Sequence, residues 1–230
     1  HDGLDPYALY IDSLILAKRG RLFVASAGNS GDWEKYHLHT DVVPDTNFTW
    51  FANNPSSAFG GSAAFWELWT DTTDFNQVQY AIGADKVGAN YEFRGRTQFY
   101  NVANNLNTLL HDTIRNDNDE VIATVQFWAQ QRDGQYLVQV YMPEPDSSNY
   151  FFRFETFGTG SFDVWSISDY GMSAIIDTVP DVSIFPDITK YVKPDTLQSI
   201  VSSFQCSPNV ITVANYANDS GYVAKYNNQW

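Results

Sequence analysis

The sequence has one cysteine, Cys206, so no disulfide bond can form within it. No histidine lies near Cys206 in the sequence, and we expect it to be a small buried residue rather than a nucleophile. Basic residues are scarce: 13 Lys and Arg stand against 27 Asp and Glu, a net charge of −14. No apolar run approaches the ~18 residues of a membrane span, and nothing at the N-terminus resembles a signal peptide. We therefore expect neither nucleic acid nor a membrane as a partner.

The most informative stretch is Leu22–Gly31, which reads Leu-Phe-Val-Ala-Ser-Ala-Gly-Asn-Ser-Gly. Its apolar run has the length and composition of a buried strand, and the glycines that follow supply a turn. An asparagine at such a strand end can direct its side-chain amide at a reacting oxyanion, and Gly28 would let a substrate backbone come close. For these last four residues alone, a plain Asn-Gly-type turn is the simpler interpretation.

The segment before this strand favours the functional interpretation. Asp5 and Pro6 are typical of an N-cap followed by proline at the first helical position, and Gly20 ends the predicted helix. The apolar residues between them recur at helical spacing: Leu4, Tyr7, Ala8, Ile11, Leu14 and Ile15. The order helix, turn, buried strand and Gly-Asn predicts an α/β unit with its chemistry at the carboxyl end of the strand.

Here the chain resembles the subtilisin-like serine peptidases, or subtilases. The resemblance runs from His1-Asp2-Gly3 through the helix to Ser26–Gly31 and resumes at Ser207–Asn215. In the family, a segment similar to the second piece follows the Gly-Asn strand closely and forms the next core strand. The resemblance implies that Asn29 is the oxyanion-hole residue. It also implies that the wall of the pocket for the residue before the scissile bond is lined by Ser26, Ala27 and Gly28.

The family's catalytic signatures are missing. A triad needs a nucleophile, a base and an orienting acid, but the sequence has no Gly-Thr-Ser-Met-Ala turn and no His-Gly-Thr-His segment. Asp219-Ser220-Gly221 resembles the aspartate signature superficially, but it follows the wrong strand and fits a plain turn. The four histidines, none with the family's flanking residues, are His1, His37, His39 and His111. We therefore expect the chain alone not to hydrolyse peptides. The expected serine endopeptidase is the parent protein that contains it.

Between the two subtilase-like pieces, the sequence predicts an all-β insertion. Val121–Trp128 and Gln135–Tyr141 flank Asp133-Gly134, a good hairpin signal. Tyr150–Phe157 and Ser161–Ile167 are predicted as a second hairpin across Gly158-Thr159-Gly160. The expected fold class is mainly β: a jelly-roll β-sandwich inserted between two pieces of an α/β subtilisin-like core. The expected division assigns residues 1–40 and 203–230 to the partial core and residues 41–202 to the insertion.

Three further patterns leave alternatives open. Planar aromatic rings on a β-sandwich could stack on sugars, although an inward core position is the default for Trp50, Trp66, Trp69, Trp128 and Trp165. Asn116–Glu120 offers oxygen ligands for calcium but lacks the EF-hand spacing, and a solvated hairpin turn is favoured. We expect His37 and His39 to point to opposite faces of a strand, which would prevent them from sharing a metal. No metal ligands are assigned: no cofactor is expected to be required, and calcium stays possible but unassigned.

Together these patterns predict a fragment of a secreted or cell-surface subtilisin-like serine endopeptidase, of bacterial type. Its partners would be a protein or peptide substrate and the remainder of the subtilase domain. Secretion follows from the resemblance and not from the scarcity of cysteine. Two alternatives are kept: a carbohydrate-binding β-sandwich module, and an inactive scaffold derived from a subtilase.

Overall fold

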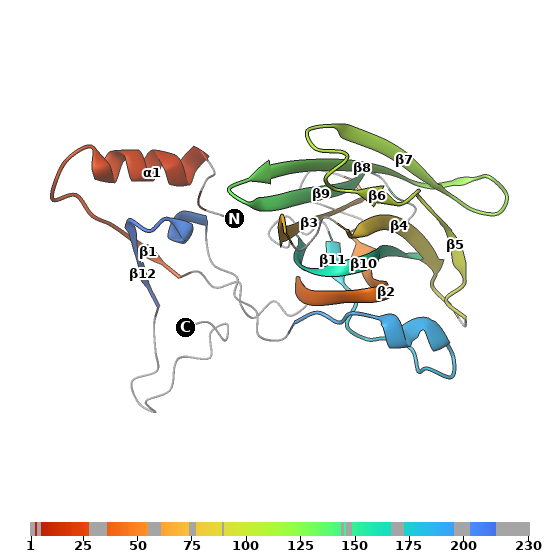
Figure 1. Ribbon diagram of the computed structural model, residues 1–230. Coiled ribbons are helices and arrows are strands. Elements are labelled where there is room, and N and C mark those ends of the chain that lie inside the picture. The colour runs from red at the N-terminus through yellow and green to blue at the C-terminus, as the bar shows by residue number, and fades with distance from the viewer. Residues whose placement is uncertain are drawn as a thin grey trace, which may run out of the picture. The chain divides into compact units, whose positions relative to one another are not determined.

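A computed structural model describes Gly3 and residues 6–27, 36–54, 61–73, 77–88, 90–143, 145, 149–166, 173–195 and 203–214. The chain forms two compact units (Figure 1). One comprises His1–Glu34 with Thr196–Trp230, and the other comprises Lys35–Asp195. The sequence-based division places the corresponding boundaries at 40/41 and 202/203.

The discontinuous unit contains a helix and two parallel strands. Helix α1 (Pro6–Leu16) begins at a proline, whose fixed φ suits the first helical turn. A turn leads to strand β1 (Phe23–Ser26), which pairs in parallel with β12 (Val210–Val213), so that Phe23 lies opposite Val210. The short 3₁₀ helix η2 (Ser203–Cys206) precedes β12. Two segments at opposite ends of the sequence therefore form one small parallel sheet.

The continuous unit is mainly β, as the composition of its segments predicts. Its strands and one short helix are β2 (His37–Asn53), β3 (Ala63–Asp71), β4 (Gln79–Lys86), β5 (Phe93–Arg96), β6 (Tyr100–Asn101), β7 (Leu109–Arg115), β8 (Val121–Arg132), β9 (Gln135–Pro143), β10 (Tyr150–Ser166), β11 (Ser173–Ile175) and the 3₁₀ helix η1 (Pro186–Lys190). The main strand order is β11-β2-β10-β3-β9-β8-β7.

The two longest strands join the two layers of a sandwich-like arrangement. β2 and β10, each of 17 residues, pair antiparallel along nearly their whole length. The first half of β10 also pairs with β4, whereas residues 163–166 pair with β3. One layer therefore continues through β4 to β5 and β6, and the other through β3, β9, β8 and β7 (Figure 1).

The predicted hairpin at Gly158–Gly160 is wrong, because Tyr150–Ser166 is one strand. The register between β10 and β2 shifts between Gly158 and Gly160, which is a β-bulge and not a reversal of the chain. Gly158 has φ +120°, and a Cβ atom there would lie 2.4 Å from the carbonyl oxygen of Gln77. The bulge and the close approach of another backbone segment both require glycine here. Glycine between two apolar runs is also the sequence signal of a turn, so the two structures look alike in the sequence.

The predicted hairpin between β8 and β9 is confirmed. Arg132 pairs with Gln135, and the two residues between them, Asp133 (φ +44°) and Gly134 (φ +82°), both adopt left-handed conformations. This two-residue connection is the type that Asp-Gly favours, because its twist matches that of the flanking strands.

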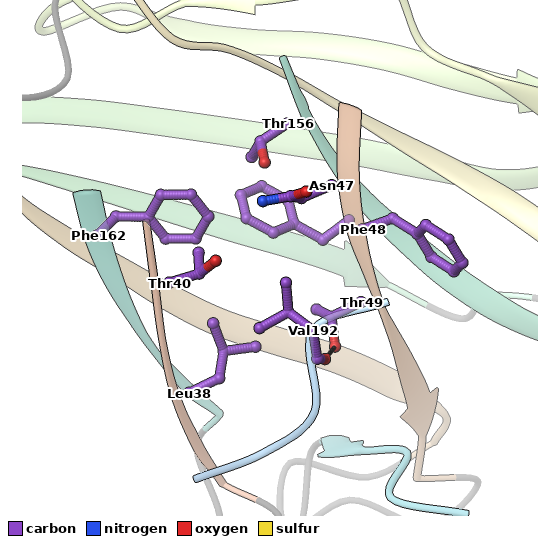
Figure 2. A pocket seen from close by; sticks show the side chains of 9 residues that line it. Leu38, Thr40, Asn47, Phe48, Thr49, Thr156, Phe162 and Val192 are labelled. Carbon is purple, nitrogen blue, oxygen red and sulfur yellow. Dashed lines mark hydrogen bonds between the residues drawn. The ribbon is translucent and has the colours of Figure 1, made fainter. Parts of the chain in front are cut away.

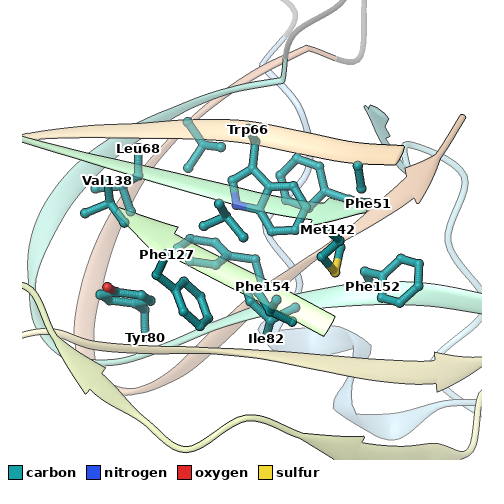
Figure 3. Close-up of a cluster of buried hydrophobic side chains, with 14 of the residues drawn as sticks. Phe51, Trp66, Leu68, Tyr80, Ile82, Phe127, Val138, Met142, Phe152 and Phe154 are labelled. Atoms are coloured by element: carbon teal, nitrogen blue, oxygen red, sulfur yellow. The ribbon is translucent and has the colours of Figure 1, made fainter. Parts of the chain in front are cut away.

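The core lies between the two layers and is rich in aromatic rings (Figure 3). Trp66 of β3 is fully buried and stacks on Phe51 of β2, with ring centroids 4.1 Å apart and 6° between the ring planes. Tyr80 of β4 meets Phe127 of β8 edge to face at 5.5 Å. These contacts connect strands of both layers.

The outer surface of the β4 layer is sealed by a second, smaller aromatic cluster. Asp85 of β4 is fully buried and accepts hydrogen bonds from the Trp50 indole (2.5 Å) and from Arg153 Nε (2.8 Å). The Arg153 guanidinium also lies 4.0 Å from the centre of the Phe48 ring. Phe185, from the segment that follows β11, packs against both Trp50 and Phe48. Burial raises the pKa of Asp85, and the hydrogen bonds from Arg153 and Trp50 offset part of that rise.

Candidate functional site

Two of the four residues expected at the peptidase site lie at the end of β1. Ser26 is the last residue of β1 and is exposed, and Ala27 is buried. The amide of Ala27 donates to the carbonyl oxygen of Val213 (2.9 Å), which extends the ladder beyond the strand end. Gly28 and Asn29 lie outside the described residues. The carboxyl ends of β1 and β12 thus meet at one edge, where the Gly-Asn segment begins.

Contacts between α1 and the segment before β12 hold this unit together. The Ser207 hydroxyl donates to the carboxylate of Asp12 on α1, and the Asn209 amide donates to the Ser207 oxygen (3.1 Å). The N-terminal Gly3 lies against Cys206, where an added Cβ atom would come within 2.8 Å of the Cys206 carbonyl oxygen. Cys206 is only partly buried, which differs from the small buried residue expected there.

Large apolar side chains of this unit face solvent. On α1, where Ala8 is buried, Tyr7 is 73% exposed and Leu16 is 70% exposed. In the parallel pair, Val24 is 52% exposed and Val213 is 50% exposed. Parallel strands normally have both faces covered by helices or other elements. The described part of this unit therefore has the apolar surface of an α/β core without the layers that usually cover it.

The five tryptophans considered for sugar binding divide into two groups. Trp50 and Trp66 are fully buried in the two aromatic clusters, so they cannot stack on a ligand. Trp69, Trp128 and Trp165 alternate with core residues along β3, β8 and β10, and their side chains are partly exposed. Trp66 therefore takes the default inward core position, Trp50 is buried on the outer side of the β4 layer, and the other three are partly exposed.

The three partly exposed tryptophans lie on the outer surface of one layer. In strand register, Trp165 lies opposite Glu67, Glu67 opposite Gln139, and Gln139 opposite Trp128. Trp69 belongs to the neighbouring row, two residues along β3 from Glu67. We call the surface formed by Trp69, Trp128, Trp165, Glu67 and Gln139 the tryptophan face.

Hydrogen bonds fix the polar centre of the tryptophan face. Gln139 Nε2 donates to Glu67 Oε1 (2.7 Å), and the Trp69 indole N–H donates to Glu67 Oε2 (3.3 Å). Neither Glu67 nor Gln139 was proposed from the sequence. The signal that could have found them is the alternation Glu67-Leu68-Trp69, because residues two apart on a strand share a face.

A histidine–aspartate cluster borders this face. Asp163 Oδ1 lies 2.9 Å from His39 Nδ1 and 3.3 Å from His37 Nε2, and the His37 ring lies 4.7 Å from that of Trp165. The expectation that the two histidines point to opposite faces was wrong, because residues i and i+2 of a strand point to the same face. Burial alone would raise the pKa of Asp163, but the hydrogen bonds and charges of His37 and His39 lower it below its ordinary value.

The loop considered for calcium is a hairpin turn between β7 and β8. Asn116 Oδ1 accepts hydrogen bonds from the amides of Asn118 (3.0 Å) and Glu120 (2.9 Å), and Asn116 Nδ2 donates to Glu120 Oε2 (2.7 Å). These side chains close the turn on itself, as the favoured interpretation predicts. Across the described ranges, no group of three or more His, Cys, Asp and Glu is arranged to hold a metal ion.

A small pocket opens beside β2 and β10 (Figure 2). Leu38, Phe48, Phe162 and Val192 line it with apolar atoms, and it has room for about one water molecule. Ligand pockets are usually several hundred Å³ in volume, so this pocket is a packing defect rather than a binding site.

No protein-family model matches the chain, and no curated protein sequence matches it. In the part of the chain that the structure describes, no helix combines the length and apolar composition needed to cross a bilayer.

Proposed function

We propose that the chain is part of a subtilisin-like serine endopeptidase, in which the segment after β1 supplies the oxyanion-hole residue Asn29. The remainder of the enzyme would supply the serine, histidine and aspartate of the triad. The peptide substrate would lie beside Ser26, Ala27 and Gly28. The continuous unit would be an accessory jelly-roll insertion in the peptidase core. Such an enzyme would act outside the cell or at its surface.

The observation that carries this proposal is the parallel pairing of β1 with β12. These strands come from the two pieces that resemble subtilases, and they pair directly although the whole continuous unit lies between them. Their common carboxyl edge is where an α/β fold places its chemistry. The exposed apolar side chains of α1 and the strands support it further, since further layers of a peptidase core would cover them.

The proposed role of Asn29 is electrostatic. When the serine attacks the scissile carbonyl, negative charge develops on the carbonyl oxygen, and the Asn29 side-chain N–H would donate a hydrogen bond to it. Removing one such donor lowers turnover by about 100- to 1,000-fold. Because the interaction forms mainly in the transition state, KM should change little.

The test is made in the complete protein encoded by the reading frame that contains this segment. Asn29→Ala should lower kcat on a peptide substrate by about 100-fold or more, with KM nearly unchanged. Asn29→Asp, which keeps the size of the side chain but loses its N–H donors, should be similarly impaired. Asn116→Ala, in the β7–β8 turn, is the control and should leave kcat intact.

An unchanged kcat in the Asn29→Ala enzyme would refute the oxyanion role. A complete reading frame without the Asp, His and Ser signatures would refute the peptidase proposal as a whole. That second result would favour an inactive scaffold with a subtilase-like core.

A further inference from the structure

The two outer surfaces of the sandwich differ in a way that the fold itself does not require. Over the β4 layer, Phe185 and Tyr191 pack on Phe48 and Trp50 and complete a buried cluster. Over the β3–β9–β8 layer, the outward indoles of Trp69, Trp128 and Trp165 stay partly exposed. Within the described residues of the continuous unit, all strands belong to one sheet, so no separate sheet covers that side.

We propose that the tryptophan face binds a neutral oligosaccharide, with Trp165 and Trp128 as stacking platforms and with Glu67 and Gln139 as the hydrogen-bonding groups between them. This inference concerns the continuous unit and does not depend on the proposed peptidase.

The spacing of the rings suits a chain of sugars. Trp165 on β10 and Trp128 on β8 share one row of the sheet, with β3 and β9 between them. Three strand spacings separate them by about 14 Å. The apolar C–H face of a pyranose ring can pack on the electron-rich face of an indole. At this separation one sugar ring cannot contact both platforms, so the ligand must be an oligosaccharide.

The polar groups between the platforms are held in place and keep capacity for a ligand. Glu67 accepts one hydrogen bond at each carboxylate oxygen, from Gln139 and from Trp69. A carboxylate has about four acceptor positions, so about two stay open for sugar hydroxyls. Because its two existing bonds fix the Glu67 side chain, little conformational entropy is lost when a ligand binds.

Charge selects against anionic ligands. Glu67 lies on the face and Asp163 lies beside it, and the chain carries a net charge of −14. The outward residues in the row from Leu109 through Trp128 to His37 include no lysine or arginine. An acidic glycan or a sulfated chain would be repelled, whereas a neutral glycan needs no cation.

A protein partner is the competing occupant. Protein interfaces are enriched in tryptophan and tyrosine but also in methionine and arginine. The tryptophan face combines its rings with an amide and a carboxylate, and it contains neither methionine nor arginine. This combination fits hydroxyl groups above a sugar ring better than the apolar side chains of a protein.

The experiment uses the full 230-residue chain and hexasaccharides derived from β-glucan, mannan, xylan and galactan. Binding is followed through the indole N–H signals in two-dimensional NMR, assigned by single Trp→Phe variants. With a binding hexasaccharide, the signals of Trp128 and Trp165 should move, whereas those of the buried Trp50 and Trp66 should not. This measurement needs no destabilised variant in the binding step.

Variants give the second readout by calorimetry. Trp128→Ala or Trp165→Ala should each weaken binding by about tenfold or more. Glu67→Gln should weaken it less while leaving ring stacking intact. Phe157→Ala removes an exposed aromatic ring from β10 away from the tryptophan face and should leave the affinity unchanged.

The proposal is overturned if none of the four hexasaccharides shifts the indole signals at millimolar concentration. Binding that survives both tryptophan substitutions would also overturn it, because the glycan would then lie elsewhere. Perturbation of Trp128 and Trp165 by a polypeptide, without any response to glycans, would identify a protein-docking surface instead.

Discussion

Replacing Gly158 with alanine tests the bulge in β10, which lies between the part of the strand that pairs with β4 and the part that pairs with β3. Gly158 has φ +120°, and its added Cβ would lie 2.4 Å from the carbonyl oxygen of Gln77 and 3.2 Å from the Val78 Cα. These neighbours are backbone atoms, so they cannot move away as a flexible side chain would. The substitution therefore forces a shift between β10 and the segment that leads into β4.

The expected cost has two parts. A left-handed conformation costs a non-glycine residue about 1–2 kcal/mol. Overpacking against a fixed neighbour adds about 1–3 kcal/mol. Gly158→Ala should therefore lower the free energy of unfolding by about 2–5 kcal/mol, a large part of the 5–15 kcal/mol typical of a folded protein.

Gly134→Ala is the matched control. Gly134 also has positive φ, +82°, but an added Cβ there meets no atom within 4 Å. Gly134→Ala should therefore lower the free energy of unfolding only by the cost of the left-handed conformation, about 1–2 kcal/mol. The assay is urea unfolding of the full chain, followed by the fluorescence of its tryptophans, with the slope m compared between variants. Equal losses in the two variants, within about 0.5 kcal/mol, would refute the close approach of Gly158 to Gln77.

Two further predictions concern buried and paired carboxylates. Asp85→Ala leaves the Arg153 guanidinium buried without its partner and should lower the free energy of unfolding, measured in urea, by about 3–5 kcal/mol. Adding Arg153→Met should recover most of that loss. A double variant no more stable than Asp85→Ala alone would contradict the stabilising role of the ion pair. Asp163 has a folded-state pKa below its ordinary 3.8, so its stabilisation is present above pH 3.8 and is lost as the pH falls through the folded value. Asp163→Asn should thus be less stable than the wild type near neutral pH, with the difference shrinking below pH 3.8; a difference that stays constant between neutral pH and pH 2 would contradict the linkage.

Local signals in the sequence predicted those elements that local chemistry decides. Pro6 marked the start of α1, and Asp133-Gly134 marked the β8–β9 hairpin, because each residue type suits one backbone conformation. Gly158-Thr159-Gly160 failed as a turn signal because glycine suits more than one backbone conformation. Glycine permits both a turn and a bulge, and only the pairing of the 17-residue strand β10 with β2 decides between them.

The tryptophan face shows the limit of the sequence more clearly. Alternation along β3 places Trp66 and Trp69 on opposite faces, but it does not tell which face the second layer covers. That choice depends on pairings between strands far apart in the sequence, such as Trp165 with Glu67. Predicting that His37 and His39 both contact Asp163 likewise needs the strand register, together with the rule that residues two apart on a strand share a face.

The hydrogen bond from the Asp195 amide to the His37 carbonyl oxygen (2.8 Å) has a consequence for the order of folding. It brings together the two ends of the continuous unit. Before that unit folds, pairing β1 with β12 must close a loop of about 180 residues. Once its two ends are joined, only about 24 residues of chain lie between the strands and those ends, 27–36 and 196–209. The entropic cost of closure falls by about (3/2)RT ln(180/24), or about 2 kcal/mol. The continuous unit, once folded, therefore shortens the connection between the parallel strands, which assemble most readily after it has formed.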